Sequence, residues 1–202
     1  MPGLLVTLEG PEGAGKSTQL GLLREAYADR DPLVVREPGG TALGEAVRGL
    51  VLHTDGVTIG AEAEMYLFMA ARAQLIAERI RPALEAGRMV LADRYHDSTL
   101  VYQGEVGGVP ASWPASFPRP DVTVLLRVPA ELGLRRQVRA GKAADRLESL
   151  PLAFHRRVAA AYERLAEREP DRFLVVDGTL PAEAVRDAIV ARIQRRLAGA
   201  VR

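Results

Sequence analysis

The chain has 202 residues, the length of an ordinary α/β domain, and is long enough to bury a core without metal or disulfide staples. Hydrophobic residues make up 48% and charged residues 26% of it, which is the balance of a globular protein. Its 27 Lys and Arg nearly cancel its 26 Asp and Glu, and a formal charge of +1 argues against a dedicated nucleic-acid binder. Cysteine is absent, which excludes disulfides, thiolate metal sites and a cysteine nucleophile.

The chain begins with neither a signal peptide nor a membrane span. Its first residues lack a basic region and reach Glu9 early, and no apolar run approaches the length that crosses a bilayer. We therefore expect a soluble, cytoplasmic protein with no membrane partner.

Short apolar runs alternate with longer amphipathic stretches, which is the pattern of βα units around a parallel sheet. The predicted strands are Leu4–Leu8, Leu33–Val35, Met89–Ala92, Val122–Val128 and Phe173–Val176. The predicted helices are Lys16–Ala28, Leu43–Leu52, Ala61–Glu85, Ala130–Arg139, Leu152–Glu169 and Ala182–Leu197. The stretch Gly104–Pro120, rich in Gly and Pro, is predicted to be an ordered loop with one helical turn. We expect one three-layer α/β domain over residues 1–202, with a five-stranded parallel sheet flanked by helices.

A phosphate-binding motif stands between the first strand and the first helix. It reads Gly10-Pro11-Glu12-Gly13-Ala14-Gly15-Lys16-Ser17-Thr18. Its glycines let backbone N–H groups surround a phosphate, Lys16 reaches the β- and γ-phosphates, and the Ser17 hydroxyl is placed to bind Mg²⁺. The motif predicts a nucleoside triphosphate site. The chain contains no Asn and hence no guanine-reading Asn-Lys-x-Asp, so a GTPase is disfavoured.

Candidate acceptor residues follow the other strands. Asp93 and Arg94 come at the carboxyl end of the third strand, the edge at which open α/β sheets bind ligands. Asp93 is placed to hold a Mg²⁺-bound water or to orient the attacking oxygen, and Arg94 to grip an acceptor phosphate. The alternative is an ion pair that caps the strand.

Two other segments are weaker candidates for part of the site. Arg36-Glu37-Pro38-Gly39-Gly40-Thr41 follows the second strand and is either a plain turn or part of a site. Phe68 and Arg72 share a helix face, where they can hold a base or form a core Phe beside a snorkelling Arg.

A basic segment at about residues 135–148 has the composition of a mobile lid. It contains Arg139, Lys142 and Arg146 around Gly141 and several alanines, and Lys142 and Lys16 are the only lysines of the chain. Such cations can close over phosphates, although a solvated helix end has the same composition. The three histidines show no metal-binding spacing and are expected to be structural or exposed, and Tyr162 is expected in the core.

In order along the chain, these motifs resemble those of the bacterial thymidylate kinase (dTMP kinase) family. The matching segments are Glu9–Thr18, Arg36–Thr41, Phe68–Arg72, Asp93–Tyr95, Tyr102–Gly104 and Asp145–Glu148. The resemblance implies the P-loop nucleoside monophosphate kinase fold, phosphoryl transfer from ATP to dTMP in dTTP synthesis, Mg²⁺, and a homodimer formed through the helix that begins at Ala61.

The resemblance also implies roles for individual residues. Glu12 contacts the deoxyribose 3′-hydroxyl, Arg94 grips the acceptor phosphate, and Arg36 and Pro38 lie nearby. The thymine is held by Phe68, Arg72, Thr99 and Gln103, while Tyr102 disfavours ribonucleotides. Because the phosphate loop has Gly13 after Glu12, the chain resembles the type whose catalytic arginine comes from the lid, with Arg146 as the first candidate and Arg139 as the second.

Two other functions stay open from the residues alone. Another P-loop kinase of a small acceptor shares the phosphate loop and the Asp-Arg pair. A nucleotide-switched binding protein would keep the loop but has no need of Arg72, Gln103 and a basic lid.

Overall fold

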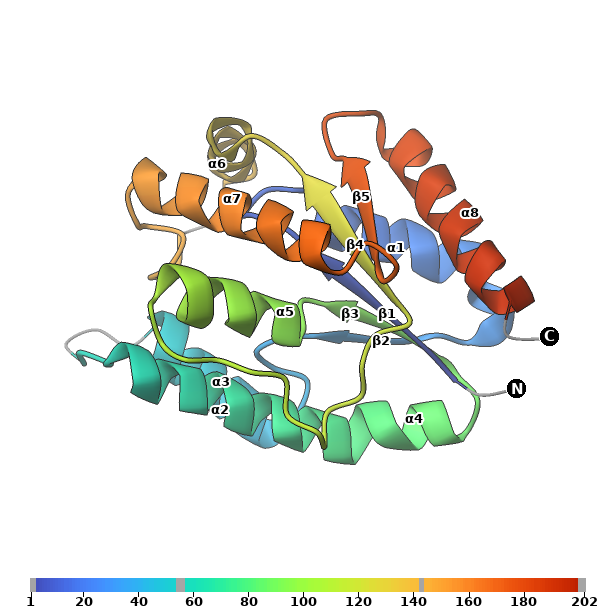
Figure 1. The fold of residues 1–202 in the computed structure, drawn as a ribbon, viewed down its shortest axis with the longest axis horizontal. Coiled ribbons are helices and arrows are strands. Elements are labelled where there is room, and N and C mark those ends of the chain that lie inside the picture. The colour runs from blue at the N-terminus through green and yellow to red at the C-terminus, as the bar shows by residue number, and fades with distance from the viewer. Residues whose placement is uncertain (1–2, 54–56, 142–143, 200–202) are drawn as a thin grey trace.

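A computed structural model describes residues 3–53, 57–141 and 144–199 of the protein. Its centre is a parallel sheet with the strand order β2-β3-β1-β4-β5 (Figure 1). The strands are β1 (Leu4–Glu9), β2 (Leu33–Arg36), β3 (Met89–Asp93), β4 (Val122–Arg127) and β5 (Phe173–Asp177). All five predicted strands are confirmed, and each ends within one residue of its predicted end.

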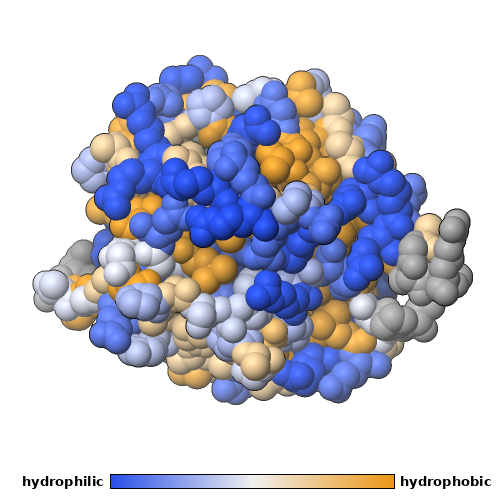
Figure 2. All heavy atoms as spheres, viewed as in Figure 1, coloured by the Kyte–Doolittle hydropathy of each residue, from blue (hydrophilic) through white to orange (hydrophobic). Residues whose placement is uncertain are grey.

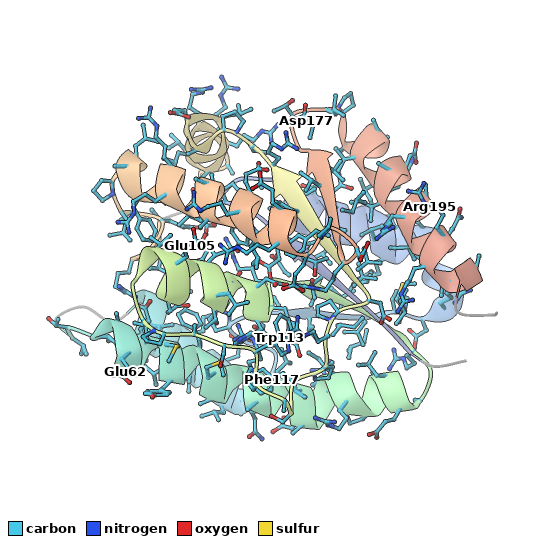
Figure 3. The ribbon with its side chains drawn as sticks, in the orientation of Figure 1. Glu62, Glu105, Trp113, Phe117, Asp177 and Arg195 are labelled. Atoms are coloured by element: carbon cyan, nitrogen blue, oxygen red, sulfur yellow. The ribbon has the colours of Figure 1, made fainter. Side chains whose placement is uncertain are left out.

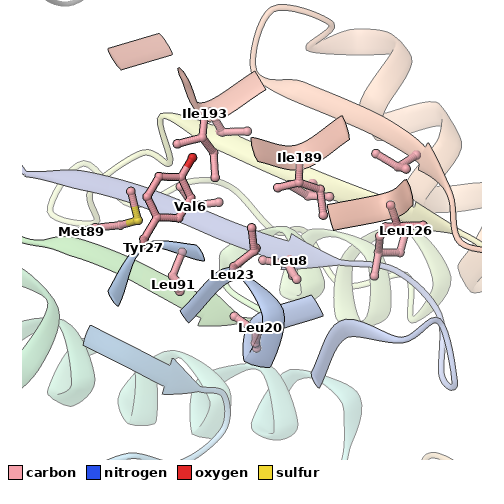
Figure 4. Close-up of a cluster of buried hydrophobic side chains, with 14 of the residues drawn as sticks. Val6, Leu8, Leu20, Leu23, Tyr27, Met89, Leu91, Leu126, Ile189 and Ile193 are labelled. Atoms are coloured by element: carbon pink, nitrogen blue, oxygen red, sulfur yellow. The ribbon is translucent and has the colours of Figure 1, made fainter. Parts of the chain in front are cut away.

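The central strand, β1, is buried over its whole length because helices cover both faces of the sheet. Leu4, Val6 and Leu8 of β1 point to the face covered by α1 (Lys16–Ala26) and α8 (Ala182–Gly199). Figure 4 shows this cluster, with Leu20 and Leu23 of α1 and Ile189 and Ile193 of α8 packed on the sheet. Leu5 packs on the opposite face.

That opposite face is covered by α3 (Ala61–Leu75), η2 (Ile76–Ile80), α4 (Arg81–Glu85) and α7 (Leu152–Arg168). The first three form the helix predicted over Ala61–Glu85, widened to π-helical turns at Ile76–Ile80. The widening directly precedes Pro82, which has no N–H to donate to the preceding turn.

One helical segment was missing from the prediction. Residues that follow β3 form α5 (His96–Thr99) and the π-helical η3 (Leu100–Val106), whereas the sequence predicted no helix between Ala92 and Gly104. Thr99, Val101 and Val106 are weak helix formers, and the segment is stabilised instead by packing on α7 and α3. The loop beyond it folds back, and Trp113 and Phe117 pack their rings against His96 (Figure 3).

The remaining helices lie toward the surface. They are η1 (Ala28–Arg30), α2 (Ala42–His53), which packs on α3, and α6 (Ala130–Arg139), which packs on α7. Figure 2 shows hydrophilic residues gathered over α7 and η3, where Arg164 and Arg168 pair with Glu105. Among the helices described, none is long and apolar enough to cross a membrane.

Candidate active site

The phosphate loop lies between β1 and α1, and its backbone is bent by glycines. Gly10, Gly13 and Gly15 have φ angles of 136°, 66° and 97°, which only glycine adopts without strain. The backbone of Gly13 also lies directly against Gly133 of α6, where a Cβ on Gly13 would meet the Gly133 carbonyl oxygen at 2.0 Å. No side chain fits at this point of the loop, so a cation in the site has to come from elsewhere.

Lys16 is folded onto this loop. Its Nζ donates hydrogen bonds to the carbonyl oxygens of Gly10 (3.1 Å) and Pro11 (3.0 Å), and the residue is buried. Burial, reinforced by the charge of Arg94, lowers the pKa of Lys16, while Glu12 and Asp93 oppose the change. The ammonium therefore lies inside the loop that the motif predicts to hold phosphates.

Ser17 and Asp93 come together from different elements. The Ser17 hydroxyl at the start of α1 donates to Asp93 Oδ2 at the end of β3, at 3.1 Å. A hydroxyl and a carboxylate beside a phosphate loop are oxygen ligands of the kind that Mg²⁺ accepts, since it takes most of its other ligands from phosphates and water. The described residues hold no group of three or more His, Asp or Glu placed for a metal, so a Mg²⁺ here needs phosphate oxygens.

Arg94 connects the phosphate loop to β3. It has a left-handed backbone (φ 67°), which is uncommon for a residue with a Cβ and recurs at functional sites. Its Nη1 donates to Gly10 O (3.1 Å) and to Tyr162 Oη (3.1 Å), and its Nη2 pairs with Glu12 Oε1 at 2.5 Å. Burial would raise the pKa of Glu12, but Arg94 and Lys16 outweigh it and hold that pKa at about 2.

A second carboxylate, Glu9, lies beneath this pair. Its oxygens accept from Tyr95 N, from Ser98 Oγ (2.7 Å) and from Tyr162 Oη (2.8 Å), and the residue is fully buried. Burial, together with the nearby charge of Asp97, raises the pKa of Glu9 to about 7, against the opposing effect of Arg94. Glu9 and Tyr162 therefore support the position of Arg94, a role that the sequence did not assign to either residue.

The predicted base-binding residues lie together on α3, α5 and η3. Arg72 is 2% exposed and pairs with Glu37 at 2.6 Å, so its guanidinium is buried rather than snorkelling. Its Nη1 donates to Thr99 Oγ1 at 2.9 Å. Phe68 lies one turn before it on α3 and is only partly buried. Glu37 lies in the loop after β2, and no pattern in the sequence indicates that it pairs with Arg72.

Gln103 and Tyr102 complete this side of the site. Gln103 Nε2 donates to Glu64 Oε1 at 2.8 Å, and Tyr102 Oη donates to Glu12 Oε1 at 3.0 Å. Arg36 extends toward solvent, 56% exposed, and pairs with Glu45.

A single cavity of about 490 Å³ joins the two sides. From the predicted residues it is lined by Glu12, Gly13, Ala14, Gly15, Lys16, Ser17, Thr18, Arg36, Pro38, Phe68, Arg72, Asp93, Arg94, Thr99, Tyr102 and Gln103. Arg136 of α6, which the sequence did not single out, also lines it.

The two arginines expected to be catalytic do not line the cavity. Arg139 is exposed at the end of α6, and among the described residues its guanidinium has no ion-pair partner. Arg146 donates from Nε to Val51 O (2.9 Å) and pairs with Glu64. The Arg146 guanidinium therefore contacts α2 and α3 and not the phosphate loop. Lys142 lies outside the described residues.

A phosphate loop, a carboxylate and hydroxyl pair beside it, and a second polar pocket on the same cavity define a P-loop kinase of the nucleoside monophosphate kinase fold. The profile of the family described as thymidylate kinase matches residues 8–189. The chain is 50% identical over 197 residues to a thymidylate kinase of Thermomicrobium roseum, covering 93% of each chain. It is 46% identical to one of Deinococcus radiodurans, covering 96% of this chain and 98% of the relative.

A solved thymidylate kinase structure from Ehrlichia chaffeensis superimposes with a TM-score of 0.71 at 25% identity, covering 96% of this chain and 99% of that one. The chain belongs to the thymidylate kinase family.

Glu9 makes the stability of the protein depend on pH. Its pKa is about 7 when folded and 4.5 in its ordinary state, so between these values the folded protein keeps a proton that the unfolded chain has lost. The free energy of unfolding therefore falls as pH rises from about 5 toward 8, by on the order of 2 kcal/mol from this group. The Glu9→Gln variant lacks this titrating group. The melting temperature of the variant minus that of the unmodified protein should therefore increase as pH rises. Thermal unfolding of both proteins from pH 5 to 8.5 measures this, and a constant difference between them over that range would refute it.

Proposed function

We propose that the protein transfers the γ-phosphoryl group of ATP to the 5′-phosphate of dTMP, giving ADP and dTDP, a step in dTTP synthesis. The observation that carries the proposal is the single cavity, which has a phosphate-binding loop at one side and Arg94, Phe68, Arg72, Thr99 and Gln103 at the other. This arrangement suits two nucleotides that meet at their phosphates. Its curated relatives carry the name of the same activity.

The donor occupies the phosphate loop. Residues Gly10–Thr18 surround the ATP phosphates with backbone N–H groups. Lys16 moves its ammonium from the Gly10 and Pro11 carbonyl oxygens to the β- and γ-phosphates. Ser17 and, through water, Asp93 are the residues that would hold Mg²⁺. When bound, the ion neutralises phosphate charge and helps to align the transferred group.

The acceptor occupies the other half. Arg94 binds its 5′-phosphate, with Arg36 and Pro38 at the edge, and Glu12 accepts a hydrogen bond from the 3′-hydroxyl. An acid with a pKa of about 2 is ionised at neutral pH and so acts only as an acceptor. Phe68 packs on the thymine, Arg72, Thr99 and Gln103 bind its polar edge, and Tyr102 fills the space that a 2′-hydroxyl would need.

The acceptor phosphate is already an anion, so the reaction needs no strong general base. Its rate comes from alignment of the two phosphates and from neutralisation of the charge that spreads over the transferred group. Lys16 and Arg94 supply two of the cations, and a lid over residues 135–148 supplies the third. We assign that third cation to Arg139, because its guanidinium is exposed and Arg146 is held by Glu64.

The proposal includes one domain over residues 1–202, a cytoplasmic location and a homodimer formed through α3. Tyr66 of that helix is 59% exposed and available to a second copy. Met65 of α3 and Ile76 of η2 are buried in the protomer.

The substrate is tested with a coupled assay of ADP release over dTMP, dUMP, dCMP, dGMP and shikimate. We expect the highest kcat/KM with dTMP and almost no ADP release without an acceptor. Faster turnover of any other acceptor would reject dTMP as the substrate, and ADP release that does not depend on an acceptor would identify a nucleotide-switched protein.

The lid cation is tested with Arg139→Ala. Loss of a cation that acts on the transferred phosphoryl group lowers kcat by at least about a hundredfold with little change in the KM for dTMP. Arg135→Ala, which removes an exposed arginine from the same helix, is the matched control and should keep most of the activity. Near-normal kcat in Arg139→Ala would move the role to another lid cation.

A further inference from the structure

Glu64 lies behind the predicted base-binding residues and contacts both Gln103, which lines the cavity, and Arg146, which does not. It is 9% exposed, at the inner face of α3. One carboxylate oxygen accepts from Gln103 Nε2 at 2.8 Å, and the other is paired with the guanidinium of Arg146. None of the motifs in the sequence points to Glu64.

The contact with Glu64 determines the orientation of the Gln103 amide. An ionised carboxylate can only accept hydrogen bonds, so the NH₂ group of Gln103 must face Glu64. Gln103 is 4% exposed and lines the cavity, which leaves its carbonyl oxygen as the atom of the amide available to a base. Without a fixed partner, the same amide could rotate and present either its oxygen or its NH₂.

An oxygen at this place favours one kind of pyrimidine edge. Thymine and uracil carry an N3–H donor, whereas N3 of cytosine is an acceptor and would face the amide oxygen without a hydrogen bond. A buried polar group left without its partner costs more than a missing apolar contact. The fixed amide thus rejects cytosine but cannot distinguish thymine from uracil.

Arg146 holds the Glu64 carboxylate in the position that this selection needs. Its backbone N donates to Leu52 O and its Nε to Val51 O, so the residue is fixed to the end of α2. Its guanidinium pairs with the carboxylate oxygen of Glu64 that does not contact Gln103, so both oxygens of Glu64 have a partner.

We propose that Glu64 is a positioning residue for base selection, which orients the Gln103 amide so that its oxygen faces the acceptor base, with Arg146 as its counterion. The proposal rests on the function proposed above. It separates the two leading lid candidates, because Arg146 acts through Glu64 on acceptor binding and Arg139 acts on the transferred phosphoryl group.

The test is Glu64→Gln, assayed with dTMP, dCMP and dUMP at saturating ATP. A glutamine at this position can accept or donate, so the Gln103 amide is free to rotate. We expect the preference for dTMP over dCMP in kcat/KM to fall at least about tenfold, mainly through KM for dTMP, while the preference for dTMP over dUMP and the KM for ATP stay unchanged. An unchanged dTMP to dCMP ratio, or an equal loss in both ratios, would overturn the proposal.

Two variants act as controls. Glu62→Gln changes an exposed glutamate on the same helix that contacts Tyr66, and should leave both ratios unchanged. In a Gln103→Ala background, Glu64→Gln should have no further effect on the dTMP to dCMP ratio, because the amide that it orients is gone. Additive effects in the double variant would contradict the proposal.

Arg146→Gln provides an independent test if Glu64→Gln does not fold. It should raise the KM for dTMP and lower the dTMP to dCMP preference. A loss of kcat with KM and the preference unchanged would instead make Arg146 the lid cation and overturn the assignment. If the unmodified enzyme does not prefer dTMP in the first place, the proposed function fails, whatever the variants do.

Discussion

Arg94 places a guanidinium at the point where the phosphate loop meets the carboxyl end of β3, and most of the site is arranged around it. A buried cation costs several kcal/mol unless it is paired and hydrogen-bonded. Glu12 supplies the pairing charge, the Gly10 carbonyl, Ser98 and Tyr162 accept further hydrogen bonds, and Glu9 accepts from Tyr162 and Ser98 in turn. The loop proposed to bind the donor and the residues proposed to bind the acceptor phosphate are therefore parts of one hydrogen-bonded network.

This network also explains the division of roles among the acidic residues. Glu12 lies beside two cations and has a pKa of about 2. Glu9 is fully buried, lies near Asp97 and has a pKa of about 7. Two carboxylates from one short segment thus differ because one is paired and the other is mainly desolvated. At the far side of the cavity, Glu64 is paired with Arg146, and there the carboxylate fixes an amide instead of a cation. In each case the neighbours of the carboxylate decide its function.

Much of the fold follows from local pattern, and much of the site does not. The five strands and the phosphate loop were predictable because apolar runs and glycine spacing act over a few residues. The helical segment from His96 to Val106 was not, since its residues are weak helix formers that depend on packing against α7 and α3. The partners of Arg146 lie 82 and 95 positions away in the sequence, and no local pattern predicts these contacts. For the same reason the resemblance in the sequence pointed to Gln103 as a candidate base-binding residue, whereas nothing in the sequence pointed to its contact with Glu64.

The central claim is that one cavity holds donor and acceptor with Arg94 at their junction. A crystal structure of the protein with dTMP and ADP tests it most directly. The account predicts the dTMP phosphate on the Arg94 guanidinium, the thymine against Phe68, and the Gln103 oxygen toward N3 with its nitrogen still on Glu64. A dTMP molecule bound outside this cavity, or with its phosphate away from Arg94, would contradict the account.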